Sequence, residues 1–318
     1  MTLMSRIGGV VSQCEFAIYN WLGGRREKRG WIVTSAQTVG SVGSLWRYPV
    51  KSMLGEEINA TLVTKRGLLG DRAYGLIDRS DGKVASAKNP RKWPQLFSFR
   101  AVLTDPSNTG RTAPPVRITL PDGDMVSTEQ ADVDEVLSKA LNRDVTLRGI
   151  GRSDRETAPT ASPGQAVGTS EEYWPDIDGL DHRDTVTDFG LPEGTYFDAA
   201  VVHVLTTATL DRLRALYPKG RFEIRRFRPN VVVSSPDGEE DFVENAWLGR
   251  TLAIGDDIRL SITVPCPRCV MTTLAQSDLP NDTGILRTAA RYNGANVGVY
   301  ASVLHGGKVR RGDTVRLE

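Results

Sequence analysis

Short apolar segments, separated at close intervals by turn residues, constrain the fold of this chain more than any other feature of its sequence. Residues 40–48, 57–64 and 73–78 are strand-like, and Gly, Asp or Pro bounds each of them. The Asp-Gly pair within 80–83 is typical of a tight hairpin turn, because both residues tolerate a positive φ. Further strand-like segments follow at 97–103, 116–120, 145–148, 201–205, 231–233, 249–264, 297–303 and 314–317. The pattern predicts a mainly β fold with some α structure, built around β barrels.

Two helices are expected between these strands. Apolar residues within 132–141 recur at the three- and four-residue spacing of a helix that buries one face. A second helix follows the strand at 201–205. Thr207 is its candidate N-cap, and the helix ends at Pro218 because proline cannot continue it.

The composition argues against several classes of protein. Lys plus Arg number 40 against 39 for Asp plus Glu, and a net charge of +1 lacks the basic excess of a nucleic-acid binder. The sequence has no run of about 18 apolar residues, so we expect no membrane-spanning helix. Three cysteines, Cys14, Cys266 and Cys269, are too few and odd in number for a secreted disulfide framework. We therefore expect a cytoplasmic protein.

Changes in composition along the chain divide it into four parts. Residues 1–38 hold an interrupted apolar stretch followed by charged residues, which is the reverse of a signal peptide. We interpret them as a disordered leader in preference to a basic amphipathic helix on a membrane surface. Residues 39–150 are expected to form a first, mostly β domain, and the polar residues 151–197 a long loop or lid. Residues 198–318 are expected to form the second domain.

The Cys-Pro-Arg-Cys segment at 266–269 admits four interpretations. A structural zinc site needs four ligands, and the pair supplies two. A thioredoxin-like dithiol needs a helix after the pair, whereas 270–274 looks β-like. One thiolate could instead bind a soft metal, with Arg268 lowering its pKa. Spacing alone favours the fourth interpretation, two inert cysteines in a core strand. The candidates for completing a zinc site are scattered along the chain: His182, His203 and His305.

Several cations stand beside small polar residues and turn signals. Lys51 precedes Ser52, Arg72 follows a Gly-Asp pair, and Arg228 precedes Pro-Asn230. Arginine and lysine with hydroxyl and amide groups are the parts of a cradle for phosphate and polar heterocycles. Each cation alone is more often a solvated surface charge, and Asp71-Arg72 could be a local ion pair. The sequence has no P-loop, dinucleotide fingerprint, Gly-x-Ser-x-Gly or His-Glu-x-x-His motif.

Taken in order, these motifs resemble the MOSC (molybdenum cofactor sulfurase C-terminal) family. Residues 46–52 and 67–72 resemble the family's N-terminal β-barrel region, and 226–230, 266–273 and 309–313 resemble the MOSC domain itself. The resemblance spans nearly the whole chain and is closest in pattern to the amidoxime-reducing branch, mitochondrial and bacterial. It implies a MOSC N-terminal β-barrel-like domain packed on a MOSC β-barrel domain.

The resemblance also implies roles for individual residues. The second cysteine of the pair, Cys269, would be the molybdenum ligand and catalytic centre, whereas no ligand role is implied for Cys266. Lys51, Ser52 and Arg72 would hold the phosphate end of a molybdenum–molybdopterin cofactor. The residues implied for the pterin side and the wall of the same pocket are Arg228, Asn230 and Thr206.

The function implied is reduction of small N-hydroxylated compounds by a molybdenum-cofactor-dependent oxidoreductase. Electrons would come from a separate donor protein, because the chain lacks the cysteines of an iron–sulfur domain. The segment 274–284 is longer than in amidoxime-reducing relatives, so the substrate stays open. One alternative is a carrier of sulfur or of the molybdenum cofactor that uses Cys269, and another is a β-rich binding domain without catalysis. Pyridoxal phosphate is also associated with the family, but nothing in this sequence supports it.

Overall fold

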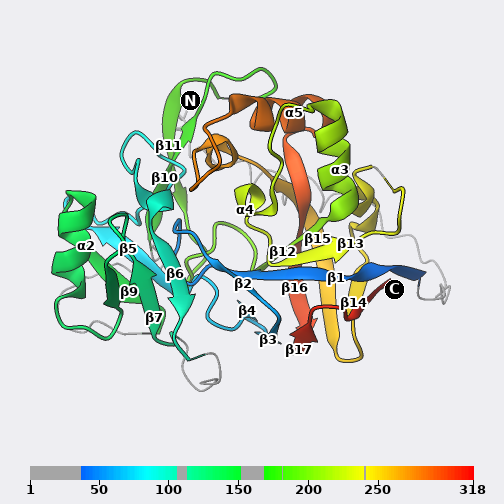
Figure 1. Ribbon diagram of the computed structural model, residues 1–318, viewed down its shortest axis with the longest axis horizontal. Helices are drawn as coiled ribbons and strands as arrows, with labels where there is room; N and C mark the ends of the chain where they lie inside the picture. Colours follow the sequence, from blue (N-terminus) through cyan, green and yellow to red (C-terminus); the bar gives the residue numbers. More distant parts are fainter. Residues whose placement is uncertain (1–36, 106–112, 152–167, 181, 240) are drawn as a thin grey trace, which may run out of the picture.

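The computed structural model describes residues 37–105, 113–151, 168–180, 182–239 and 241–318. The predictions for the leader fall almost wholly on residues 1–36, which lie outside this range. A closed seven-stranded barrel forms the right-hand half in Figure 1, with strand order β13-β12-β16-β15-β14-β18-β1 and β1 paired back to β13. Its strands are β1 (Gln37–Arg47), β12 (Val202–Thr206), β13 (Val231–Ser234), β14 (Thr251–Ile254), β15 (Ile258–Pro267), β16 (Asn296–His305) and β18 (Thr314–Leu317).

Alternation of apolar residues explains the barrel. Along β15, Ile258, Leu260 and Ile262 are buried at every second position, so one face of the strand points into the interior. The other barrel strands contribute valines and leucines to the same core. The predicted mainly β fold is confirmed.

The two sequence-defined domains exchange strands. Strand β1 lies at the start of the first domain, yet it pairs with β13 and β18 of the barrel. In return β17 (Gly307–Arg310), near the end of the chain, pairs with β3 (Ala60–Thr64), which also pairs with β4 (Gly67–Leu68). Strand β2 (Glu56–Ile58) pairs antiparallel with the last residues of β1. This exchange ties the loop that follows β1 firmly to both halves of the molecule.

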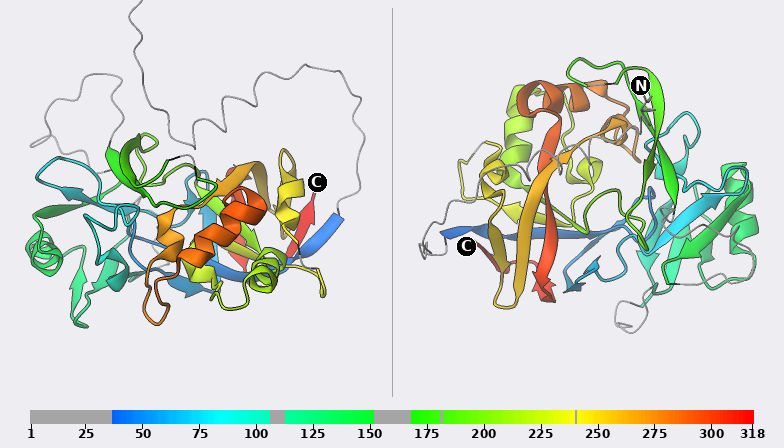
Figure 2. Two further views of the ribbon diagram at one scale, coloured as in Figure 1. Left: turned by 90° about the horizontal axis from the view of Figure 1, so that it is seen from above. Right: turned by 180° about the vertical axis from the view of Figure 1, so that it is seen from behind.

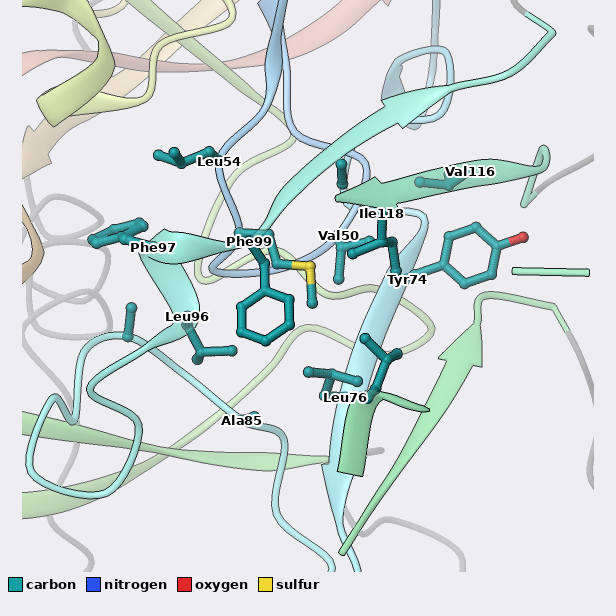
Figure 3. Packing of buried hydrophobic residues seen from close by; sticks show 14 of the residues in the cluster. Val50, Leu54, Tyr74, Leu76, Ala85, Leu96, Phe97, Phe99, Val116 and Ile118 are labelled. Atoms are coloured by element: carbon teal, nitrogen blue, oxygen red, sulfur yellow. The ribbon is translucent and has the colours of Figure 1, made fainter. Parts of the chain in front are cut away.

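The other half, on the left in Figure 1, has its own core. Figure 3 shows Phe99 at the centre of this core, with Val50, Leu76 and Ile118 around it. Each of these side chains is at most 1% exposed. The elements that supply the core are β5 (Tyr74–Asp78), β6 (Arg100–Leu103), β7 (Val116–Thr119), β8 (Met125–Ser127), β9 (Val145–Gly149), the 3-10 helix η1 (Leu96–Ser98) and helix α2 (Val133–Leu141).

Helices cover one end of the barrel. They are α3 (Thr207–Leu216), α4 (Ile224–Phe227), α5 (Thr283–Asn293) and the 3-10 helices η2 (Val243–Trp247) and η3 (Val270–Thr273). The prediction that Thr207 caps α3 was wrong. The Thr206 hydroxyl accepts the Thr209 N–H at 3.1 Å, while the Thr207 hydroxyl accepts the N–H of Ser235 at 2.9 Å. Within the described residues no helix has the length and apolar character needed to cross a membrane.

The described part of the expected loop at 151–197 contains a hairpin. Strand β10 (Thr169–Trp174) pairs antiparallel with β11 (Thr185–Gly190). The green hairpin stands between the cyan strands of the first half and the orange helix α5 in Figures 1 and 2. Its position places it beside the junction of the two halves.

Candidate functional site

One cavity at the junction gathers most of the residues that the sequence singled out. Its walls enclose about 1000 Å³ when the solvent at its mouth is included. Six of the predicted site residues line it: Lys51, Ser52, Arg72, Arg228, Asn230 and Cys269.

Three of these residues share an unusual backbone conformation. Ser52, Arg72 and Arg228 have φ values of 65°, 47° and 54°, in the left-handed region that non-glycine residues seldom occupy. Neighbouring groups hold them there: the Ser52 hydroxyl accepts the Ala87 N–H at 3.0 Å, and the Arg72 N–H donates to the Tyr48 carbonyl at 2.9 Å. Such strain persists only where the surroundings fix it, and it concentrates at functional sites.

Arg228 brings a buried cation to the cavity. It donates to the Met53 carbonyl at 2.6 Å, and its guanidinium lies 4.2 Å from the centre of the Tyr48 ring. Burial lowers the pKa of Arg228 to about 10, which still leaves it charged at neutral pH. Within the described residues no carboxylate forms a salt bridge with it. Since buried charges are normally paired, this guanidinium favours an anionic ligand.

Asp71 and Asn230 tie the two halves together behind the cavity. The Asp71 carboxylate accepts the Tyr48 N–H at 2.7 Å, an Arg72 Nη1–H at 2.5 Å and an Asn230 Nδ2–H at 2.9 Å. The Asn230 amide also donates to the Trp46 carbonyl at 3.3 Å and accepts the His203 N–H at 3.1 Å. The Asn230 amide therefore uses its N–H groups in hydrogen bonds within the protein. Its main role is to hold the residues behind the cavity in place.

Two lysines and two carboxylates form a charged wall of the cavity. The Lys51 ammonium pairs with Asp198, and the Lys88 ammonium lies 3.3 Å from the other Asp198 oxygen and 3.2 Å from Glu172. Burial lowers the pKa of Lys51, and Asp198 opposes that effect. Although burial acts to raise it, the pKa of Asp198 lies well below its usual range because Lys51 and Lys88 stabilise the charged form. Lys88 and Glu172 gave no motif in the sequence, and the fold alone reveals them.

The structure separates the two cysteines. Cys269 is half-buried, lines the cavity and stands just before η3. Burial raises the pKa of the Cys269 thiol to about 11; Lys88 and Arg268 lower it and Glu172 raises it, so the predicted effect of Arg268 is present but outweighed. Cys266 is fully buried, with its Sγ 2.7 Å from Nη1 of Arg268.

The segment after Cys269 is not the expected β-like run but a 3-10 turn. The Thr272 and Thr273 hydroxyls donate to the carbonyls of Cys269 and Val270 at 3.0 and 2.8 Å, so local side-chain bonds outcompete strand formation. Across the described ranges, no three His, Cys, Asp or Glu side chains are placed to hold a metal ion together. The geometry therefore gives no support to the zinc interpretation.

Arg268 supplies a second, half-buried cation. Its Nη2 donates to the Phe227 carbonyl at 2.9 Å, but its buried Nε has no hydrogen-bond partner in the part of the chain that the structure describes. The cavity lining holds five cations, Lys51, Arg72, Lys88, Arg228 and Arg268, against the two carboxylates Glu172 and Asp198. This excess of positive charge, next to one accessible thiol, fits an anionic cofactor that carries a thiophilic metal.

Thr206 is not brought to this cavity. Its side chain is fully buried as the N-cap of α3, and its hydroxyl donates to the Glu244 carboxylate at 2.7 Å. The predicted wall position fails because the helix terminus needs this hydroxyl.

Arg226 connects the segment that carries Arg228 to the segment that follows Cys269. It is fully buried, two residues before Arg228, and makes no salt bridge within the described ranges. Its guanidinium donates at 2.8–3.1 Å to four backbone carbonyls, those of Arg221, Thr272, Leu274 and Pro280. Arg226 therefore fixes the long segment after Cys269 relative to Arg228.

Replacing Arg226 by methionine is expected to lower the free energy of unfolding by about 3 kcal/mol or more, because several buried carbonyls lose their donors. Chemical denaturation measures this change. Arg225→Met is the matched control, since Arg225 pairs with Glu223 and Asp278 near the surface. Its effect should stay within about 0.5 kcal/mol. Equal losses in the two variants would contradict the role assigned to Arg226.

Comparison with known proteins gives two family matches. The MOSC N-terminal beta barrel domain matches residues 39–157, and the MOSC domain matches residues 192–316. The mitochondrial amidoxime reducing component 2 of Bos taurus is 27% identical over 265 residues, covering 79% of this chain and 69% of that protein. The mitochondrial amidoxime-reducing component 1 of Mus musculus is 26% identical over 254 residues, covering 78% and 68%. The solved structure of the YUAD protein from Bacillus subtilis covers 89% of this chain and 97% of that one, at 11% identity and a TM-score of 0.42.

Proposed function

Because this chain belongs to the MOSC family, with a MOSC N-terminal β-barrel domain followed by a MOSC domain, we propose that its cavity binds a molybdenum–pterin cofactor and reduces N-hydroxylated compounds. One observation carries the proposal. A half-buried thiol, Cys269, lines the same cavity as two guanidinium groups, the buried Arg228 and the half-buried Arg268, that have no carboxylate partner within the described residues. An anionic cofactor that carries a metal would satisfy both features at once.

Different residues would hold different parts of this cofactor. Cys269 supplies a sulfur ligand to the metal, since thiolates suit soft metal centres. Arg228 and Arg72, with the hydroxyl and backbone of Ser52, face the phosphate and the heterocycle, and Arg268 adds a further guanidinium. Asp71 and Asn230 hold these groups in place through the bonds that join the two halves. The excess of cations offsets the charge of a phosphate.

When bound, the cofactor supplies the two-electron chemistry that cleaves an N–O bond. The overall change consumes two electrons and two protons and releases water with the reduced nitrogen compound. Residues of this chain bind the substrate beside Cys269 and supply charged groups close to it. The Nζ of Lys88 holds its protons between Glu172 and Asp198 at the cavity wall. Electrons come from a separate donor protein in this proposal.

The names of the relatives support the substrate class. Both curated relatives are called amidoxime reducing components, and an amidoxime carries an N–O bond. We propose the same class of reaction here.

Cofactor-loaded protein is expected to reduce benzamidoxime to benzamidine when reduced methyl viologen supplies the electrons. Product formation measured by chromatography checks this expectation, with cofactor-free protein as the control. Transfer of the cofactor to a second apoenzyme, without any benzamidine formed, would contradict the reductase and favour a carrier.

A further inference from the structure

The hairpin β10–β11 lies outside both family matches. These matches end at residue 157 and resume at residue 192, whereas the hairpin strands run over Thr169–Trp174 and Thr185–Gly190. Three of its residues nevertheless line the cavity: Glu172, Trp174 and Phe189. A segment that neither match includes thus builds part of the wall.

Alternation along the hairpin explains which residues reach the cavity. In β10, Ser170, Glu172 and Trp174 are buried at every second position, while Glu171 and Tyr173 between them are more exposed. Successive side chains of a strand point to opposite faces, so Glu172 and Trp174 share the inner face. Phe189 of β11 stands opposite Ser170 in the register. The inner face therefore combines one carboxylate with two aromatic rings.

Ion pairs on the outer face fix this wall to the first half of the molecule. The Lys83 ammonium bonds Glu171 at 2.9 Å and Asp188 at 2.7 Å, one residue from each strand. Arg91 bonds the Tyr173 hydroxyl at 3.0 Å. On the inner side the Ser170 hydroxyl donates to the Val84 carbonyl at 2.8 Å. Because both strands are held, the wall is a fixed surface, which is the condition for selecting between similar ligands.

Glu172 retains hydrogen-bonding capacity toward the cavity. Its Oε2 accepts from the Lys88 ammonium at 3.2 Å, and within the described residues no hydrogen bond reaches Oε1. Both oxygens of the neighbouring carboxylate, Asp198, face lysines. The indole N–H of Trp174 donates to the Thr187 hydroxyl at 2.8 Å. Trp174 therefore contributes an apolar surface to the cavity.

The wall also lies near the thiol. Glu172, Trp174 and Phe189 line the same cavity as Cys269. A ligand bound at Cys269 therefore occupies a cavity that this carboxylate and these rings help to line.

We propose that Glu172, with Trp174 and Phe189, selects substrates in which N–H donors stand beside the N–O bond on a planar group. This inference rests on the proposed function and refines it. N-hydroxylated amidines and guanidines have such donors, which Glu172 Oε1 accepts while the rings pack on the planar part. N-oxides have no N–H donor, so binding them leaves Oε1 of Glu172 without a hydrogen-bond donor. A polar group left unpaired in this way discriminates between ligands by about 10- to 100-fold.

The test compares Glu172→Gln with wild type in the cofactor-loaded full chain. Lys88 should hold the new amide with its oxygen toward the ammonium and its NH₂ toward the cavity, where it opposes a donor. The ratio of kcat/KM for benzamidoxime to kcat/KM for pyridine N-oxide is expected to fall about 10- to 100-fold. Glu135→Gln, at an exposed position of helix α2 away from the cavity, is the matched control and should keep the ratio of the wild type.

A binding measurement on cofactor-free protein separates this inference from the proposed function. Benzamidine, an amidine without an N–O bond, should bind the Glu172→Gln protein about tenfold more weakly than wild type by calorimetry. If the Glu172→Gln protein keeps the ratio of the wild type and its affinity for benzamidine, the inference is overturned. The proposed reductase activity would be unaffected by that result. Absence of turnover in wild type would instead count against the proposed function.

Discussion

The Cys269→Ser protein is expected to contain almost no molybdenum and to lose its N-reductase activity. Cys269 supplies the thiol at the wall of the cavity, and a serine hydroxyl is a poor ligand for a soft metal. Losing a residue that merely orients a metal ligand costs about 10- to 100-fold in affinity or activity. Loss of the ligand itself should exceed that. Metal analysis and the benzamidoxime assay measure the two effects.

Cys266→Ser is the control for this variant. Cys266 is fully buried and contacts Arg268 instead of lining the cavity, so the variant should keep its metal even if its stability falls. Equal metal contents in Cys269→Ser and wild type would show that the thiol at 269 is not a ligand.

Replacing Arg228 by methionine is expected to reduce the retained cofactor about 10- to 100-fold, because a charge-assisted hydrogen bond contributes about 1.5–3 kcal/mol. In the cofactor-free protein the same change removes a buried charge that no described carboxylate pairs. The Met53 carbonyl then loses the hydrogen bond that Arg228 donates, and we expect the variant to fold. Pterin and molybdenum content after dialysis measures the retained cofactor.

Arg225→Met serves again as the control, because Arg225 stands three residues away and bonds Glu223 and Asp278 instead of lining the cavity. Cofactor retention should match that of the wild type. Similar losses in the two variants would mean that total charge, and not the position of Arg228, governs binding.

Local pattern predicted most of the strands because alternation and turn residues act within a few positions. The barrel strand Val202–Thr206 and the hairpin Thr251–Pro267 arise where apolar periodicity and Gly-Asp turns indicated them. Helix α5 was missed because its start, with Asp282 accepting the Gly284 N–H, lies in a segment of mixed composition. The strand that pairs with β1 could not be predicted from the sequence either. Pairing between Gln37–Arg47 and Val231–Ser234 depends on closure of the whole barrel.

The candidate site was predictable only through the order of its motifs. Nothing local brings Lys51, Arg72 and Arg228 together, yet the fold gathers all three around Cys269. Thr206 was misplaced because a threonine at a strand end serves equally well as a helix cap. Lys88 and Glu172 carry no motif, and they reach the cavity through a loop and a hairpin whose positions are tertiary. Tertiary contacts of this kind leave little trace in a single sequence.

Metal analysis of the wild-type chain, purified from cells with an intact molybdenum cofactor pathway, tests the central claim most directly. The account predicts about one molybdenum atom per chain, since one thiol in each cavity is placed to bind it. Folded protein that comes from such cells without molybdenum or pterin would contradict it.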